Sequence, residues 1–263
     1  MLNLFSISVR ALFCFFLIAC GAFSISLASE HIELKKEKWK FDGPFGTFDR
    51  QAIQRGFKVY REVCSACHAV SRLSFRNLME IGFSKEEADS IASDYTVEDG
   101  PDDSGAMFQR PAKIFDHLPG PFENENAARA ANNGAYPPDL SLIIKAREGD
   151  ADYVYSILTG YKKDVPPSIV LGDGMHYNPY FQSEQIAMSP PLLSDGQVDY
   201  TDGTNPTIDQ MARDVVNFLQ WVAEPEMEQR KSLGVRVIIF TIIFTLIMYL
   251  AKRRIWSRLH KKD

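Results

Sequence analysis

The sequence Cys64-Ser65-Ala66-Cys67-His68 constrains this chain more than any other feature. The C-x-x-C-H pattern is the attachment signature of c-type haem. Two thiols three positions apart on one helical turn can bond to the two vinyl groups of a haem, and the adjacent histidine can then reach the iron as proximal ligand. The pattern therefore predicts one covalently bound haem c, held by Cys64 and Cys67 with His68 on the iron.

Two other chemistries use paired cysteines. A zinc site would need a second C-x-x-C or a Cys/His pair further along the chain, and no cysteine follows Cys67. A thioredoxin-like dithiol would lie at the strand-to-helix turn of a βαβ unit, and no such pattern surrounds Cys64. Haem attachment is favoured, and a redox dithiol or disulfide is the remaining alternative.

Residues 1–28 are typical of a cleaved secretory signal peptide. Arg10 is their only charged residue, residues 11–24 are apolar, and Ser26-Leu27-Ala28 offers a small-x-small cleavage site. An uncleaved anchor and lipidation at Cys20, which follows a lipobox-like stretch, stay open as alternatives. Export fits the haem motif, because c-haem is attached outside the bacterial cytoplasm.

A second apolar segment, residues 233–251, predicts a transmembrane helix. At 1.5 Å per residue, about 19 residues span roughly 28 Å, enough to cross a hydrocarbon core. The tail that follows, residues 252–263, is basic and by the positive-inside rule faces the cytoplasm, or the matrix of an organelle. We therefore expect a single-pass protein of the bacterial inner membrane, with residues 29–232 as a haem domain on the periplasmic side.

The net charge of −5 hides a strong asymmetry along the chain. Residues 29–235 hold 21 Lys and Arg against 33 Asp and Glu, a net charge of −12, whereas residues 236–263 carry a net charge of +6. An acidic exported domain would attract a basic partner by long-range steering; the simpler interpretation is that the acidic residues keep it soluble. Nucleic acid is disfavoured as a partner.

Local signals predict a helical domain interrupted by long loops. Apolar residues at helical spacing predict a helix over 50–67, capped by Thr47 or Asp49, that ends at the haem motif. Ser84 with Glu87 predicts a capped helix over 84–93. Further helices are expected over 74–80, 127–133, 139–147, 150–160 and 207–223. Residues 106–126 and 161–187 are expected to be irregular, and no strand-rich region is visible.

A haem iron with one histidine ligand needs a second axial group or stays open to exogenous ligands. Met188 is the favoured candidate, because the prolines of Met188-Ser-Pro-Pro191 fix the backbone beside it. Met211 lies on the apolar face of a predicted helix, where a core role is the better interpretation.

Several stretches of the chain, in order, resemble the cytochrome c1 family, the haem subunit of the cytochrome bc1 (ubiquinol–cytochrome c reductase) complex. The resemblance covers nearly the whole chain after the signal segment and is carried by these stretches: Gln54-Arg-Gly-Phe-Lys-Val-Tyr-Arg-Glu-Val-Cys-Ser-Ala-Cys-His68, Ala127-Ala-Arg-Ala-Ala-Asn-Asn-Gly-Ala-Tyr-Pro-Pro-Asp-Leu140, Tyr153-Val-Tyr-Ser-Ile-Leu-Thr-Gly-Tyr161, Asn178-Pro-Tyr-Phe181, Ile186-Ala-Met-Ser-Pro-Pro191 and Trp221-Val-Ala-Glu-Pro-Glu226.

The resemblance implies roles for individual residues. His68 and Met188 would be the axial iron ligands. Arg129 would pair with a haem propionate, although a solvated arginine is the alternative, and Pro137 and Pro138 would pack beside the haem. The implied fold is an all-α, class I cytochrome c-like haem domain with long loops, plus one C-terminal transmembrane helix.

The implied function is electron transfer without bond chemistry, so the isolated chain would not be an enzyme. The Rieske iron–sulfur protein would donate the electron and a cytochrome c would accept it, while quinol oxidation would belong to cytochrome b and the Rieske protein in a complex expected to be dimeric. Two other functions stay open: a membrane-tethered electron shuttle outside any quinol complex, and a haem sensor or peroxidase with an open iron site.

Overall fold

The computed structural model describes residues 32–257. The predicted signal peptide, the lipobox-like Cys20 and the last residues of the basic tail lie outside this range. The α-helices are α2 (Arg50–Val59), α3 (Lys85–Ser93), α4 (Glu125–Ala131), α5 (Ile143–Ala146), α6 (Asp150–Thr159), α7 (Ile208–Ala223) and α8 (Met227–Ser257). A π-helical turn (Tyr60–Cys64) follows α2, and a 3₁₀ helix covers Phe75–Ile81.

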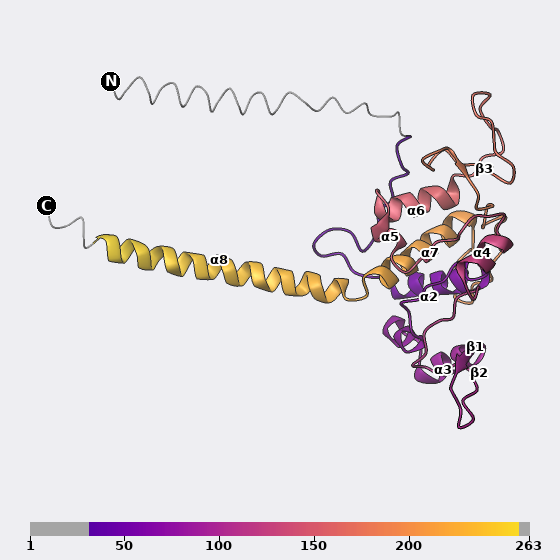
Figure 1. Cartoon of the computed structure of the whole chain (residues 1–263). Coiled ribbons are helices and arrows are strands. Elements are labelled where there is room, and N and C mark those ends of the chain that lie inside the picture. The colour runs from indigo at the N-terminus through magenta and orange to yellow at the C-terminus, as the bar shows by residue number, and fades with distance from the viewer. Residues whose placement is uncertain (1–31, 258–263) are drawn as a thin grey trace, which may run out of the picture. The chain divides into compact units, whose positions relative to one another are not determined.

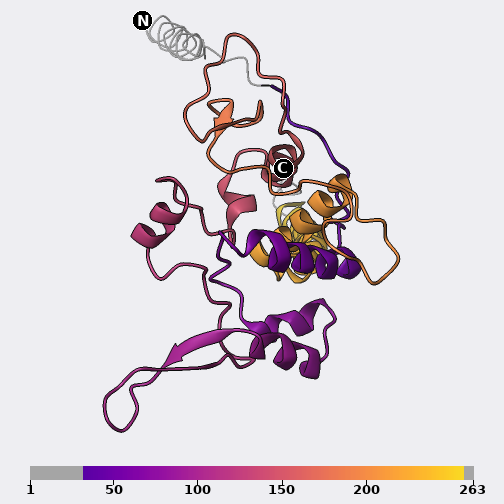
Figure 2. The ribbon, with the colours of Figure 1, turned by 90° about the vertical axis from the view of Figure 1, so that its right-hand side faces the viewer.

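Helices α2 and α7 lie side by side and form the centre of the domain (Figures 1 and 2). Each begins at a side-chain cap, of which Asp49 was one of the two predicted: the Asp49 side chain accepts a hydrogen bond from Ala52 N, and the Thr207 side chain accepts one from Gln210 N. The two helices approach so closely at Gly56 that a Cβ added there would lie 1.9 Å from the Asp214 carbonyl oxygen. Only glycine fits this crossing.

Aromatic side chains fill the space around the crossing. Phe218 of α7 has its ring centroid 5.6 Å from Phe57, 5.5 Å from Tyr60 and 6.1 Å from Trp221. All four side chains are buried. Large aromatic surfaces contribute most of the apolar area that such a core removes from water.

One buried ion pair also joins the two helices. Arg55 of α2 reaches Asp214 of α7 with Nε–Oδ2 and Nη2–Oδ1 distances of 2.8 and 2.9 Å. The Asp214 side chain is 1% exposed. Removing Arg55 would leave a buried, uncompensated carboxylate, which is far more costly than losing an exposed pair.

The outer helices largely match the sequence-based expectations. Ser84 caps α3 and exchanges hydrogen bonds with Glu87, which confirms the predicted capping box. Helix α6 ends at Gly160 as expected. The helix predicted over 139–147 is wrong in length, because Asp139 and Ser141 make hydrogen bonds to residues 71 and 72 and only Ile143–Ala146 is helical.

Two short antiparallel hairpins accompany the helices of this helix-rich domain. Strands β1 (Thr96–Asp99) and β2 (Phe108–Pro111) form one, and β3 (His176–Tyr177) and β4 (Gln185–Ile186) form the other. The first hairpin carries the exposed loop 100–107 away from the helices (Figure 2). Strands of two to four residues are too short to show an alternating apolar pattern.

Helix α8 includes the predicted span and begins earlier. It runs for 31 residues without interruption, and an 18-residue window within it is apolar enough to cross a membrane. Its first turn belongs to the domain: Met227 is 2% exposed, and Glu228 accepts a hydrogen bond from Phe48 N at 2.7 Å. The described residues contain one such candidate span.

Candidate functional site

The chain delivers both predicted haem cysteines on one tight turn. The π-helical turn after α2 is closed by the hydrogen bond from Ser65 N to Tyr60 O (2.8 Å). Cys67 N and His68 N then both donate to Cys64 O, at 3.1 and 2.9 Å. Cys64 is partly buried, Cys67 is exposed, and neither forms a disulfide. The two thiols and the histidine are therefore held together as the motif requires.

This turn does not suit redox thiol chemistry. Burial raises the pKa of the Cys64 thiol to about 12, whereas reactive dithiols have lowered pKa values and expose a thiolate. The segment before Cys64 is helical rather than the end of a strand. Within residues 32–257, no group of three or more His, Cys, Asp or Glu side chains is arranged to hold a metal ion.

His68 has one ring nitrogen engaged by the protein. Its Nδ1 lies 2.8 Å from the Pro138 carbonyl oxygen, which can only accept, so Nδ1 carries the proton. Burial lowers the pKa of His68, although the bond to Pro138 acts in the opposite direction. The imidazole is therefore neutral near pH 7 and its Nε2 lone pair is free. Metal-bound histidines characteristically donate the other ring N–H in this way.

A ladder of hydrogen bonds fixes the segment after the motif against residues 138–141. Leu140 N donates to Ala69 O at 2.8 Å, and Ser71 N donates to Asp139 Oδ2 at 3.0 Å. Burial would raise the pKa of Asp139, but the hydrogen bonds from Ser141 and Ser71 outweigh it and lower the pKa. The structure thus brings Pro138 to His68. It records no polar contact for the neighbouring Pro137, which is half-buried.

Met188 lies on a separate segment, just after β4. The Tyr161 hydroxyl donates to the Met188 carbonyl oxygen at 3.0 Å, and the Met188 side chain is half-buried. The hairpin before it is tied to α6 by Asn178, which is fully buried and donates to Ile157 O at 2.8 Å. None of the hydrogen bonds among residues 32–257 joins Met188 to Cys64, Cys67 or His68.

Sequence reasoning had not assigned the supporting roles of Tyr161 and Asn178. Both stand in stretches that resemble the cytochrome c1 family, and that is the one signal that could have found them. The partners they bind are backbone carbonyl groups, which the sequence does not mark.

Arg129 is held in a local network on α4. Its guanidinium donates to Glu125 Oε1 at 2.9 and 2.6 Å and to Gly134 O at 2.9 Å. It also lies 5.5 Å from the centre of the Tyr136 ring. The structure therefore places Arg129 beside the 134–138 segment and does not bring it into contact with the cysteines, His68 or Met188.

The residues present fit a haem. Two free thiols and a neutral imidazole with a free Nε2 lie on one turn. Apolar side chains that flank the predicted ligands are also exposed: Tyr136 and Leu142 on either side of the 138–141 ladder, and Leu193 after Met188. Exposed apolar surface beside convergent polar groups is suited to a large, mostly apolar ligand.

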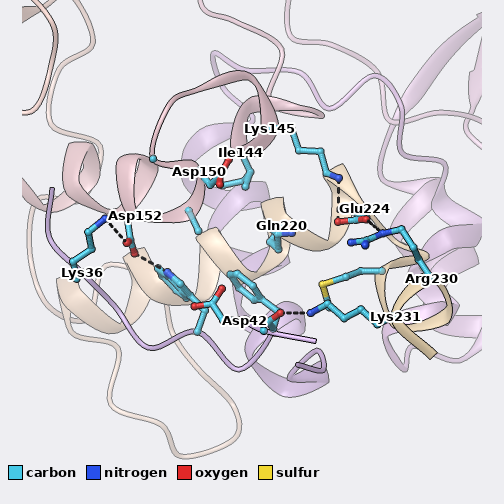
Figure 3. A pocket seen from close by; sticks show the side chains of 16 residues that line it. Lys36, Asp42, Ile144, Lys145, Asp150, Asp152, Gln220, Glu224, Arg230 and Lys231 are labelled. Atoms are coloured by element: carbon cyan, nitrogen blue, oxygen red, sulfur yellow. Dashed lines mark hydrogen bonds and ion pairs between the residues drawn. The ribbon is translucent and has the colours of Figure 1, made fainter. Parts of the chain in front are cut away.

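One cavity lies elsewhere. It has a volume of about 470 Å³, is lined by residues of the 36–43 segment, of 144–152 and of 220–231, and includes none of the predicted site residues. Figure 3 shows Glu224 between Lys145 and Arg230, and Asp152 beside Lys36. Because these charges pair with one another, the cavity adds no candidate for haem chemistry.

Comparisons with known proteins agree with the motifs. A model described as the Cytochrome C1 family matches residues 39–259. "Cytochrome c1, heme protein, mitochondrial" of Saccharomyces cerevisiae is 46% identical over 231 residues, 88% of this chain and 74% of that protein. "Cytochrome c1" of Rhodospirillum rubrum is 43% identical over 240 residues, 86% of this chain and 88% of that protein. "Cytochrome b/c1" of Bradyrhizobium diazoefficiens is 48% identical over 244 residues, 85% of this chain but 35% of that longer protein.

The helix-rich domain and its C-x-x-C-H turn are those of a c-type haem domain. The match to the family model is more specific, and it confirms the resemblance predicted from the sequence: the chain belongs to the cytochrome c1 family.

Proposed function

We propose that this chain is the haem-carrying, electron-transfer subunit of a cytochrome bc1 complex. It receives one electron from the Rieske iron–sulfur protein and passes one electron to a cytochrome c. No bond of a substrate is made or broken on this chain, so it is not an enzyme by itself. Quinol oxidation belongs to the partner subunits, cytochrome b and the Rieske protein.

The observation that carries this proposal is the environment of His68. Its Nδ1–H donates to Pro138 O at 2.8 Å, on the turn that also presents Cys64 and Cys67. This hydrogen bond fixes the tautomer and the plane of the ring, and it makes the Nε2 lone pair more basic. In this role Cys64 and Cys67 form thioether bonds and His68 is the proximal iron ligand.

Met188 is the proposed second axial ligand. The hydroxyl of Tyr161 holds the Met188 carbonyl group, and burial raises the pKa of Tyr161, so that the hydroxyl remains a donor at physiological pH. When bound, the haem supplies a one-electron iron couple, whose potential a His/Met ligand pair raises. Arg129 is proposed to pair with a propionate, and Pro137 and Pro138 to pack against the haem edge.

The proposed topology is that of an exported, anchored domain. Residues 1–28 are removed as a signal peptide, residues 29–232 form the haem domain on the periplasmic side of the bacterial inner membrane, and residues 233–251 span it. Residues 252–263 remain on the cytoplasmic side. The long apolar helix α8 and the basic residues after it support this orientation. The assembled complex is proposed to be dimeric.

The iron ligands are tested by absorption spectra of the full chain, matured with c-haem, as wild type and as Met188→Leu. The expected result is a covalent, low-spin haem whose ferric sulfur-to-iron charge-transfer band disappears in the variant. If the band survives the substitution, the sulfur ligand is another methionine. Its absence from the wild type favours an open or bis-histidine iron site and contradicts the proposal.

The complex is tested by purification of the tagged chain from its native membrane. Co-purification of a b-type cytochrome and a Rieske protein is expected. A chain that purifies with a terminal oxidase or alone is instead a tethered electron shuttle.

A further inference from the structure

Phe45 is the most exposed aromatic side chain among residues 32–257, with 79% of its surface accessible. It lies in residues 42–46, here called the Phe45 loop, between two buried aromatic residues, Phe41 and Phe48, which are 5% and 7% exposed. A single exposed apolar side chain is ordinary on a protein surface. Phe45 differs from such a side chain in two ways: the backbone of its loop is fixed, and the loop is attached to the start of α8.

The shape of the Phe45 loop is fixed by its own backbone. Gly43 has a φ of +70°, and a Cβ at Gly46 would lie 2.2 Å from the Asp42 carbonyl oxygen, so both positions require glycine. The loop is closed by the hydrogen bond from Thr47 N to Lys40 O at 3.0 Å. The exposure of Phe45 is therefore set by the fold and is not that of a frayed tip.

The loop is attached to the start of α8. Lys231 donates to the carbonyl oxygens of Phe41 and Gly46, the second at 3.4 Å. One turn earlier, Glu228 accepts from Phe48 N and pairs with Arg50, each at 2.7 Å. Both sides of the Phe45 loop are thus held by the first residues of the long apolar helix.

This attachment sets the depth of the loop. The apolar run begins at Leu233, two residues after Lys231 and therefore about 3 Å further along the helix axis. The headgroup layer on each side of a bilayer is roughly 5–8 Å thick, from a total of about 40–45 Å around a core of about 30 Å. If Leu233 enters the hydrocarbon, the Gly46 carbonyl at Lys231 and the adjacent Phe45 lie in the headgroup layer.

We propose that Phe45 inserts into the headgroup layer of the lipid bilayer, as a second membrane contact beside α8. The inference rests on the proposed role of α8 as the span. Aromatic side chains favour this layer, because their apolar rings leave water there without entering the hydrocarbon core. The occupant of this surface is therefore lipid. Phe45 extends the exposed apolar surface that α8 presents from Leu233 onward.

The test uses the full, haem-loaded chain in lipid nanodiscs, with Phe45→Trp as reporter and the emission of wild type subtracted. Lipids with bromine near the carbonyl end of the acyl chain should quench the new tryptophan more than lipids with bromine near the methyl end. The ratio between lipids cancels quenching by the haem. Phe115→Trp is the matched control: Phe115 is 56% exposed, follows β2, and has no recorded contact with α8.

A second reporter separates this inference from the span itself. Phe244→Trp, near the middle of the apolar run, should be quenched most by bromine near the methyl end. If Phe244→Trp is quenched and Phe45→Trp behaves like the Phe115→Trp control, α8 spans the membrane but Phe45 does not contact lipid, and the inference fails. If neither is quenched, the span fails as well.

Discussion

His68 owes its orientation to a residue 70 positions later in the chain. The carbonyl group of Pro138 cannot be removed by substitution, but the side chain next to it can. Asp139 accepts from Ser71 N at 3.0 Å and from Ser141 N at 2.7 Å, and so holds the two segments together. The position of the proposed iron ligand thus depends on an aspartate that does not touch it.

Asp139→Ala should lower the free energy of unfolding by about 1–3 kcal/mol, because the partly buried N–H of Ser141 and the exposed N–H of Ser71 both lose their acceptor. The measurement is urea unfolding of the holo chain followed by helical circular dichroism. Asp103→Ala is the control, since Asp103 is exposed and makes no hydrogen bond or ion pair within the described residues; its effect should stay within about 0.5 kcal/mol. Equal losses in the two variants would refute a structural role for Asp139.

Asp202 should make stability depend on pH in acid. Hydrogen bonding from Thr204 N, and then Arg55, lowers the pKa of Asp202 to about 2. A lowered folded-state pKa gives stability that is complete above the ordinary value of about 3.9 and is lost as the pH falls through the folded value.

Asp202→Asn should therefore have a flatter curve of unfolding free energy against pH than wild type between about pH 4 and pH 2. The two proteins should differ most near neutral pH, where wild type keeps the whole contribution of the carboxylate, and should converge in acid; the difference should be modest, because the side chain is 36% exposed. Parallel curves through the acid window would show that Asp202 contributes nothing to acid stability.

The contact between α2 and α7 depends on one glycine. At Gly56 an added Cβ would lie 1.9 Å from the carbonyl oxygen and 2.5 Å from the carbonyl carbon of Asp214. Backbone atoms of a helix cannot move aside as a flexible side chain can. The two helices would have to separate, and the buried pair of Arg55 and Asp214 would separate with them.

Gly56→Ala should therefore destabilise the domain by at least the 1–3 kcal/mol that is typical of overpacking. Thermal unfolding of the holo chain measures this. Gly234→Ala is the matched helical control, because a Cβ there meets nothing within 4 Å. If Gly56→Ala unfolds at the same temperature as wild type, the two helices can separate without a loss of stability.

Elements that are marked by residues close together in the sequence were predictable. Features that depend on hydrogen bonds between residues far apart in the sequence were not. Ser84 and Glu87 mark the start of α3 within three residues, and apolar residues at helical spacing mark α7, so both helices followed from the sequence. The helix predicted over 50–67 instead passes into a π-helical turn at Tyr60. For the candidate site, the motif predicted the cysteines and His68, but the hydrogen bonds from His68 to Pro138 and from Tyr161 to Met188 bridge 70 and 27 positions.

At the scale of the whole chain, the domain does not end where α8 begins. Met227, in the first turn of α8, is buried in the core, and Glu228 and Lys231 contact residues 41–50. The domain therefore extends to within two residues of the apolar run that begins at Leu233, and one continuous helix carries both.

Two truncations should separate anchoring from packing. A chain that stops after Ser232 should leave the membrane fraction and retain the melting temperature of the domain. A chain that stops after Pro225 should also be soluble but melt lower, because it loses the buried Met227 and the hydrogen bonds of Glu228 and Lys231. Identical melting temperatures would show that the first turn of α8 stabilises nothing.

Because α8 is unbroken from Met227 to Ser257, it also sets a rotational phase between domain and span. One residue inserted after Ser232 would turn the two by about 100° around the helix axis and lift the domain by about 1.5 Å. Seven inserted residues would return the phase to within about 20° but raise the domain by roughly 10 Å. A partner that contacts one side of the domain would be sensitive to the rotation, whereas a partner that contacts the domain at a fixed distance from the membrane would be sensitive to the height. Insertions of one and of seven residues would therefore affect these two partners differently.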